Sequence, residues 1–383
     1  MKQVREWICR QRLARGLGAV FFLALVPALG LTLSPDNEAV AGTTRHYYVA
    51  ADEVAWDYAP LGFNNISGQP FGPEENVFVQ TGRDRIGRVY VKALYREYTD
   101  ATFSTLKPRP PAWEHLGALG PVIRAEVGDI IVVHFRNNTR FPVSMHPHGV
   151  FYEKDAEGAP YNDGTSGFDK GDDAVPPAGE WTYTWPVPER AGPGPNDPSS
   201  ILWMYHSHVD EPGDTNAGLI GPMIISARRT TRANGTPRDV DREFVTMFTV
   251  FDENRSPYLD LNIETYAQVP TSVDPDDEGF IESNLMHSIN GFVFGNLPGL
   301  DMSVGERVRW YELGMGTEVD LHTPHWHGQT LLLNGNRTDI VELLPASMKT
   351  LDMVPDNPGT WLFHCHVNDH IDAGMLALFT VTP

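Results

Sequence analysis

The sequence predicts an all-β chain folded as two β-sandwich domains in tandem, and three observations support this class. Short apolar or alternating runs, such as residues 122–135 and 244–251, are separated by clusters of Gly, Pro, Asn and Asp, as is typical of strands joined by turns. The 35 glycines and 31 prolines suit many turns, and no long stretch has a helical apolar period, so helix should be minor. The chain also repeats its own motifs, and its 383 residues suffice for two domains.

The internal repeat sets the expected domain limits. Four motifs recur in the same order in both halves of the chain: VGD at 127–129 and VGE at 304–306, HPHG at 146–149 and HWHG at 325–328, WMYHSH at 203–208 and WLFHCH at 361–366, AGL at 217–219 and AGM at 373–375. Because order and chemistry both persist, we expect two copies of one sandwich. We place them at residues 46–228 and 240–383, joined by a polar linker at 229–239.

The first 41 residues differ from the rest. Five basic residues precede the apolar run 17–33, and Ala39-Val40-Ala41 offers a small-residue cleavage site. This order is typical of a signal peptide, so we expect residues 1–41 to be removed and the protein to be exported, to a periplasm or to the extracellular space. A retained membrane anchor is the alternative, because the apolar run is nearly long enough to span a bilayer.

Charge and cysteine content narrow the function. The formal net charge of −21 argues against nucleic acid as a partner. With Cys9 in the expected signal peptide, Cys365 is the only thiol of the remaining chain, so no disulfide can form within it. A single thiol in an exported protein needs protection, and ligation by a metal is one way to supply it.

Histidine spacing indicates metal binding. Ten of the 14 histidines fall in four tight clusters: His146/His148, His206/His208, His322/His325/His327 and His364/His366/His370. Residues i and i+2 of a strand share a face, so each HxH sets two imidazoles side by side, as a metal site between facing strands requires. One such pair alone is better explained by packing, but four clusters at repeated positions favour a metal site.

The last cluster predicts two sites on one strand. Cys365 lies between His364 and His366 and therefore points to the opposite face. On its side, His370 and Met375 follow at the turn and His322 comes from an earlier strand, which gives two imidazoles, a thiolate and a thioether. That donor set is typical of blue copper, an electron-transfer centre, whereas structural zinc favours more thiolates.

Eight imidazoles remain for the other face, four from each domain. They are more than one metal needs, and neutral imidazole suits copper, so a multinuclear copper cluster between domains is expected. Electrons entering at Cys365 can reach it through the adjacent peptide links. The first domain has Val143, Ser207 and Leu219 where the second has His322, Cys365 and Met375. It therefore keeps the cluster ligands without the blue site.

These motifs resemble those of multicopper oxidases over nearly the whole chain after residue 41. Stretches such as HPHGVFYEKDAEGAPYNDGTSGFDK and DLHTPHWHGQT are similar to ceruloplasmin-type ferroxidases, while the two-domain plan resembles small laccases. The resemblance implies two cupredoxin-like Greek-key sandwiches that carry four coppers per chain. It assigns His322, Cys365, His370 and Met375 to the type 1 copper, His146 and His325 to type 2, and His148, His206, His208, His327, His364 and His366 to the type 3 pair.

The resemblance also implies a reaction and an assembly. The family reduces dioxygen to water, and Asp163 matches an acid that delivers protons there, although a turn-forming Asp is an equal alternative. Ceruloplasmin has six cupredoxin units where this chain has two, so we expect a homotrimer with each trinuclear cluster between neighbouring subunits. A cluster within one chain is the alternative.

The reductant is the least defined part. Glu282, His287 and Asp369 match the iron site of ceruloplasmin-like ferroxidases, and hard oxygens with one imidazole suit Fe²⁺. Fe²⁺ is therefore the favoured substrate, with phenols, aromatic amines or Cu⁺ as alternatives. A turn-capping Glu282 and a core His287 would explain the same residues.

Two other classes of copper protein share parts of this plan. A copper nitrite reductase has two such domains but leaves most of the eight histidines without a use, and an electron carrier needs only the type 1 ligands. Copper content separates them, at about four per chain for an oxidase, two for a reductase and one for a carrier.

Overall fold

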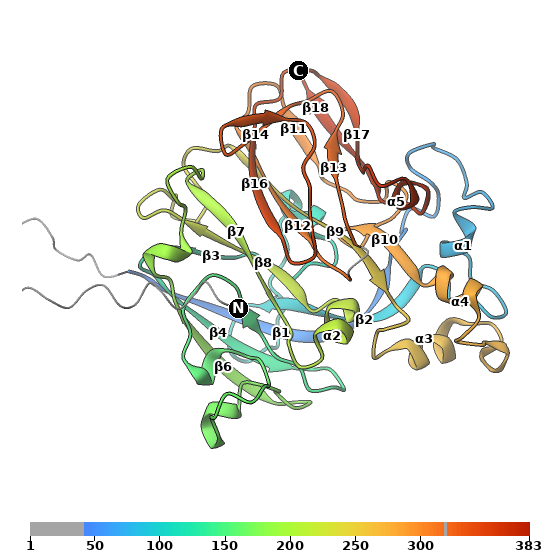
Figure 1. Ribbon diagram of the computed structural model, residues 1–383, viewed down its shortest axis with the longest axis horizontal. Helices are drawn as coiled ribbons and strands as arrows, with labels where there is room; N and C mark the ends of the chain where they lie inside the picture. Colours follow the sequence, from blue (N-terminus) through green and yellow to red (C-terminus); the bar gives the residue numbers. More distant parts are fainter. Residues whose placement is uncertain (1–41, 318–319) are drawn as a thin grey trace, which may run out of the picture. The chain divides into compact units, whose positions relative to one another are not determined.

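The computed structural model describes residues 42–317 and 320–383, so the expected signal peptide lies outside the described residues. Strands joined by turns and short helices make up this part of the chain (Figure 1). Its helices are α1 (Asn76–Val79), α2 (Glu211–Ala217), α3 (Leu259–Tyr266), α4 (Glu278–Ser283) and α5 (Asn368–Asp372), with 3₁₀ turns η1 (Pro111–Leu116), η2 (Lys154–Ala156), η3 (Gly167–Lys170), η4 (Glu189–Ala191) and η5 (Pro270–Ser272). None of the described helices is long and apolar enough to cross a bilayer.

The first sandwich pairs two four-stranded sheets. One has the order β2-β1-β4-β6, built from β1 (Thr44–Asp57), β2 (Val89–Tyr98), β4 (Ile130–Asn137) and β6 (Glu180–Pro186). The other has the order β3-β8-β7-β5, built from β3 (Ile123–Glu126), β5 (His146–Pro147), β7 (Ser200–His206) and β8 (Ile220–Ser226). Alternate residues such as Val49, Val133 and Ile225 point inward and form one hydrophobic core.

The second sandwich repeats this plan. A six-stranded sheet has the order β10-β9-β12-β16-β14-β15, from β9 (Arg242–Asp252), β10 (Leu285–Ile289), β12 (Val308–Gly314), β14 (Leu331–Leu333), β15 (Asn336–Thr338) and β16 (Met348–Met353). The facing sheet has the order β11-β18-β17-β13, from β11 (Asp301–Ser303), β13 (Pro324–Trp326), β17 (Gly359–Cys365) and β18 (Leu376–Thr382).

Strand directions confirm the repeat. β1 runs parallel to β4 as β9 does to β12, and β3 runs parallel to β8 as β11 does to β18. The pairs β5–β7 and β13–β17, which carry the HxH motifs, are both antiparallel. The prediction of an all-β chain with two sandwiches in tandem is therefore confirmed.

Besides a core in each sandwich, one hydrophobic cluster is shared by the two. It joins side chains of the first half, such as Leu202 and Ile224, to side chains of the second half, such as Val245 and Phe280. The segment between β1 and β2 contributes Phe78, whose ring packs against His287 with centroids 5.9 Å apart. Residues from 41 onward form one compact unit, so the limits 46–228, 229–239 and 240–383 remain a prediction.

Candidate metal centres

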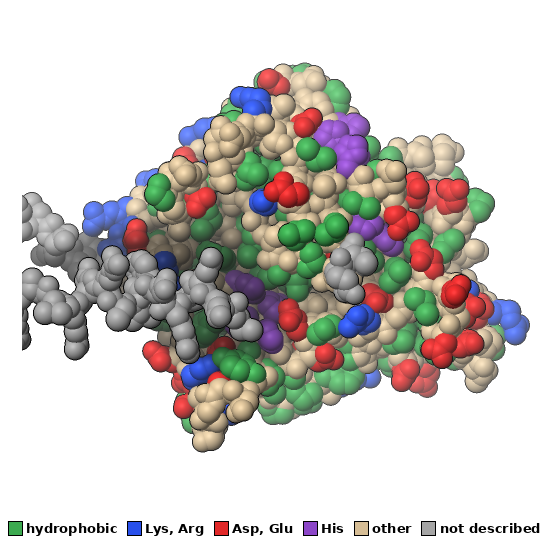
Figure 2. Space-filling model, in the orientation of Figure 1, with side chains coloured by type: hydrophobic (Ala, Val, Ile, Leu, Met, Phe, Trp, Pro, Cys, Tyr) green, Lys and Arg blue, Asp and Glu red, His purple; other side chains and the backbone are tan. Residues whose placement is uncertain are grey.

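Figure 2 shows histidine side chains gathered in separate patches on one face of the molecule. Two sets of three ligand atoms lie within 4.8 Å of one another in the described part of the chain: His322, Cys365 and His370, and His325, His364 and His366. β17 contributes to both sets, because Cys365 points into the core with Phe363 while its histidine neighbours point to the other face. The structure thus brings these ligands together as strand alternation predicts.

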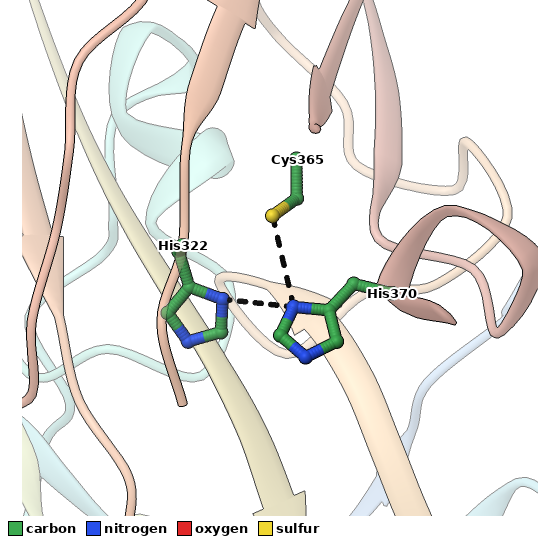
Figure 3. Close-up of side chains that lie close together, drawn as sticks. All are labelled: His322, Cys365 and His370. Carbon is green, nitrogen blue, oxygen red and sulfur yellow. Dashed lines mark hydrogen bonds between the residues drawn. The ribbon is translucent and has the colours of Figure 1, made fainter. Parts of the chain in front are cut away.

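The Cys365 set is a buried cluster of two imidazoles and one sulfur (Figure 3). The Nδ1 atoms of His322 and His370 lie 3.2 Å apart, and Nδ1 of His370 lies 3.6 Å from the Cys365 sulfur. Backbone amides of Thr323 and Val367 each donate to that sulfur at 3.4 Å. Burial alone would raise the pKa of Cys365, but hydrogen bonds from the two imidazoles and the two amides lower it to about 6. The thiolate, the form that binds metals, is therefore favoured.

Met375 lies beside this set because of the turn that follows α5. Its carbonyl accepts a hydrogen bond from the Cys365 amide at 3.2 Å, and its own amide donates to the His370 carbonyl at 2.8 Å. Gly374 has a φ of 111°, and a Cβ there would approach the Phe294 ring to about 2.9 Å. Only glycine fits this position without strain, so the turn depends on it.

Asp320 supports the set from outside, and the sequence argument missed it. One of its oxygens lies 3.4 Å from Nε2 of His322, and its carboxylate accepts the amides of Val250 and Thr317 at 2.9 and 2.7 Å. The negative charge of this carboxylate favours the proton on Nε2 and leaves Nδ1, which faces His370, as the metal-binding nitrogen. The spacing Asp-Leu-His in 320–322 was the available signal.

The first sandwich carries one set of four imidazoles, His146, His148, His206 and His208. β5 and β7 pair His146 with His206, and the Nε2 atoms of His148 and His206 lie 3.1 Å apart. Nδ1 of His146 bonds the Glu157 carbonyl and Nδ1 of His206 bonds the Ser207 carbonyl, at 2.7 and 2.9 Å. Burial first, and then neighbouring imidazoles, lower the pKa of His148 to about 4. The pKa values of His146 and His206 are lowered as well, so these three rings are neutral, as metal binding requires.

The second sandwich carries the matching set, His325, His327, His364 and His366. β13 and β17 pair His325 with His364, whose Nε2 lies 3.3 Å from Nδ1 of His325 and 3.0 Å from Nε2 of His327. Nδ1 of His364 bonds the Cys365 carbonyl at 2.7 Å, as His206 does with Ser207. Burial first, then other imidazoles, lower the pKa of His364 to about 4.

The two four-imidazole sets stay apart within the chain. Rings contact one another inside each set, with centroids 5.2 Å apart for His146 and His208 and 4.9 Å apart for His325 and His366. Among the described residues, no ring of one set packs against a ring of the other.

Two of the predicted iron-site residues lie beside His370: Asp369 precedes it in the chain and His287 packs against its ring. Glu282 and Asp369 are exposed, on α4 and α5, whereas His287 on β10 is buried with its ring centroid 5.2 Å from that of His370. Nδ1 of His287 bonds the Leu285 carbonyl at 2.9 Å, which leaves Nε2 as an acceptor. Burial, and then the negative charge of Asp369, raise the pKa of Glu282. The three residues are not one of the ligand sets found within 4.8 Å in the described residues.

Asp163 has the contacts of a turn-forming residue. Its carboxylate accepts the amide and hydroxyl of Thr165 at 2.9 and 2.7 Å and pairs with Lys154 and Lys170 at 3.2 and 2.9 Å. These contacts, led by the Thr165 hydroxyl, lower the pKa of Asp163. A carboxylate with a lowered pKa is ionised at neutral pH and is ill suited to store a proton. These contacts favour the turn-forming role, and the role of Asp163 in proton delivery stays a prediction.

Comparison with known proteins identifies the family. Residues 116–230 and 264–383 match two family models, each described as multicopper oxidase. The chain belongs to the multicopper oxidase family. It is 48% identical over 367 residues to Ferroxidase HEPHL1 of Homo sapiens, covering 95% of this chain and 31% of that protein. It is 44% identical over 353 residues to Ceruloplasmin of Homo sapiens, covering 92% of this chain and 33% of that protein. The chain thus spans about a third of these relatives.

Solved structures support the fold of this multicopper oxidase. The multicopper oxidase mgLAC aligns with a TM-score of 0.55 and 18% identity, covering 88% of this chain and 86% of that one. A copper nitrite reductase from Nitrosomonas europaea aligns with a TM-score of 0.55 and 17% identity, covering 89% of this chain and 94% of that one. These likenesses show the cupredoxin-like fold alone.

The donor atoms present fit copper. Beside Met375, a thiolate-prone sulfur and two ring nitrogens converge in a buried site, and His148 and His364 of the four-imidazole sets have lowered pKa values that keep them neutral. Two more carboxylates that the sequence argument missed lie near the rings: Glu211 is 3.7 Å from Nε2 of His208, and Asp339 is 3.7 Å from Nε2 of His325. Asp339 follows β15, and no local motif links it to His325.

Proposed function

We propose that this chain is a copper-dependent oxidase that takes single electrons from Fe²⁺ and delivers them to dioxygen. The observation that carries the proposal is the geometry at the end of β17, where Cys365 belongs to one ligand set and its neighbours His364 and His366 belong to another. Bound copper, one type 1 ion at His322, Cys365, His370 and Met375 and three ions on the eight remaining histidines, supplies one-electron oxidation of the reductant and four-electron reduction of dioxygen to water.

The chain itself joins the two ligand sets. Cys365 is linked through one peptide bond to each of His364 and His366, and its carbonyl also bonds Nδ1 of His364 at 2.7 Å. Both a covalent and a hydrogen-bonded route therefore run from the sulfur to the second face. Carbonyl partners at Nδ1 of His146, His206 and His364 fix those protons and leave Nε2 free for a metal.

Fe²⁺ is the substrate that fits the residues around His370. Glu282 and Asp369 are exposed carboxylates within reach of a dissolved ion, and hard oxygen ligands favour the Fe³⁺ product. His287 packs against His370, which is a type 1 ligand in this proposal, so oxidation would take place next to the electron acceptor. The similarity to proteins named as ferroxidases supports the same choice.

We also propose a homotrimer in which the His146 set of one subunit meets the His325 set of the next. Each set holds half of the eight imidazoles, and the described rings of the two sets do not touch within one chain. His366 is exposed and free to face a partner. A head-to-tail contact of this kind closes into a ring, which completes every cluster at once.

Copper content and native mass test the proposal together. The protein loaded with copper should bind about four ions per chain, have the mass of three chains, and oxidise Fe²⁺ with a higher kcat/KM than a bulky phenol. Two ions per chain would point to a reductase and one to an electron carrier. A monomer with full turnover would refute the shared cluster, and a preference for the phenol would refute the iron site.

A further inference from the structure

A large cavity lies apart from the residues assigned to copper and iron. Its volume is about 910 Å³, and it opens between β1, β2 and the loop 106–122. Sites that enclose small organic molecules have volumes of this order. Three partly exposed aromatic residues contribute to its wall: Tyr47, Trp56 and Trp113. The cavity therefore offers flat apolar surfaces to a ligand.

The charge of the wall is opposite to that of the protein. Five cationic side chains and a single acid, Glu97, line the cavity, although the chain carries a net charge of −21. The cations are Arg45, Arg96, Lys107, Arg109 and Arg124. Four of them have acidic partners: Arg45 with Asp129 at 2.6 Å, Arg124 with Glu243 at 3.0 Å, Lys107 with Glu97 at 2.7 Å and Arg96 with Asp52 at 3.5 Å.

Arg109 is the exception. No carboxylate of the described residues pairs with it, and its two terminal nitrogens donate to the carbonyls of Gly117 and Leu119, each at 2.7 Å. These two bonds hold the guanidinium plane and leave three of its five N–H donors available. Pro108 and Pro110 flank the residue and restrict the backbone on both sides. The wall therefore carries one fixed, uncompensated positive charge.

We propose that this cavity binds an aromatic monocarboxylate. One carboxylate matches the single free guanidinium, whose planar fork suits two parallel N–H···O bonds. A flat ring system can pack against Trp56, Trp113 and Tyr47. A neutral ring leaves the spare donors of Arg109 without an acceptor, and a second negative charge finds its possible partners already paired.

Naphthalene-2-carboxylate and its neutral analogue naphthalene-2-carboxamide test the proposal on the copper-loaded native protein. Isothermal titration should give at least about tenfold tighter binding of the carboxylate, because a charge-assisted pair replaces neutral hydrogen bonds. Equal affinities would overturn recognition of the anion. No binding of either compound at millimolar concentration would overturn the site itself.

Two substitutions locate the ligand. Arg109→Gln should weaken the carboxylate about tenfold and leave the carboxamide unchanged. Trp113→Leu should weaken both compounds alike, which keeps the site testable if Arg109→Gln disturbs the loop at Gly117 and Leu119. Arg337→Gln is the matched control, since this exposed arginine also has no carboxylate partner among the described residues and lies on β15. Carboxylate preference that survives Arg109→Gln, or loss of it in the control, would refute the assignment.

Discussion

The two sandwiches use the same backbone for different chemistry. In the second, the Thr323 amide donates to the Cys365 sulfur at 3.4 Å; in the first, the Ser144 amide donates to the Ser207 hydroxyl at 3.0 Å. The amide of Met375 donates to the carbonyl of His370, and the amide of Leu219 donates to that of Asp214, at 2.8 and 3.0 Å. These bonds match residue by residue, so the scaffold of the blue site is intact in both.

The difference lies in a few side chains. Ser207 donates to Asp214 at 2.6 Å where Cys365 contacts His370 at 3.6 Å, and Val143 stands in place of His322. Asp214 takes the place of His370. The sequence did not indicate this directly, because the segment from His208 to Ala217 is two residues longer than the segment from His366 to Ala373. A buried hydroxyl–carboxyl pair thus replaces the thiolate–imidazole pair. The metal-binding set therefore depends on side chains that can be exchanged while the turn geometry is retained.

Cys365→Ser gives the second sandwich the hydroxyl of the first and should have the largest effect. We expect the blue absorption band and oxidase turnover to disappear, because a hydroxyl is a poor ligand for copper of this type. Copper on the eight histidines should remain, as measured by metal analysis and electron paramagnetic resonance. Ser207→Ala is the control and should retain turnover. Turnover that persists in Cys365→Ser would show that electrons enter elsewhere.

Asp320→Ala removes the carboxylate beside the type 1 ligand His322. The first sandwich has Val143 in place of that histidine, so it has no ligand for such a carboxylate to orient. Loss of the partner at Nε2 of His322 should lower type 1 copper affinity or turnover about tenfold to a hundredfold. Asp320→Asn retains one acceptor oxygen, which can keep the bond from the Val250 amide or the bond from the Thr317 amide, and should restore part of the loss. The blue absorption spectrum reports the change; an unaltered spectrum and rate would exclude the positioning role.

Glu282→Ala combined with Asp369→Ala tests whether Fe²⁺ binds at the carboxylates of the second sandwich. We expect the KM for Fe²⁺ to rise about tenfold while the KM for a phenol stays within about twofold, since a phenol needs no carboxylate ligand. Asp260→Ala, an exposed acid on α3, controls for surface charge. Equal changes for both substrates would remove the iron site from the proposal.

Asp214→Asn should have the smallest effect on activity and a measurable one on stability. Burial raises the pKa of Asp214 from 3.8 to about 6. The folded state therefore holds this proton more tightly, and the resulting stability is complete below pH 4 and lost as pH rises through about 6. Urea unfolding of the wild type should lose up to about 3 kcal/mol across that window through this group. The variant should lack this component, and identical pH profiles would contradict it.

Much of the fold and site followed from periodicity. Strand alternation alone assigned Cys365 to one ligand set and His364 to the other, because the side-chain period of a strand is two. The internal repeat identified Val143 and Ser207 as replacements for ligands. Both inferences depend on local geometry, which the sequence carries directly.

Other features depend on contacts between distant segments. Nothing near Asp339 indicates His325, and nothing near Phe78 indicates His287, since tertiary packing alone joins them. Lys154 and Lys170 reach Asp163 because the loop between them folds back, which favours the turn interpretation of that residue. Such long-range contacts have no local signature in one sequence.

The hydrophobic cluster shared by the sandwiches limits how this chain can be rebuilt. Leu202 and Ile224 of the first half are buried against the same cluster as Val245 and Phe280 of the second. Each half alone would therefore expose apolar side chains on that side. A chimaera that exchanged one sandwich for that of a relative would bring mismatched apolar side chains together there. We therefore expect recombination and gene duplication to transfer the two sandwiches together, as one unit.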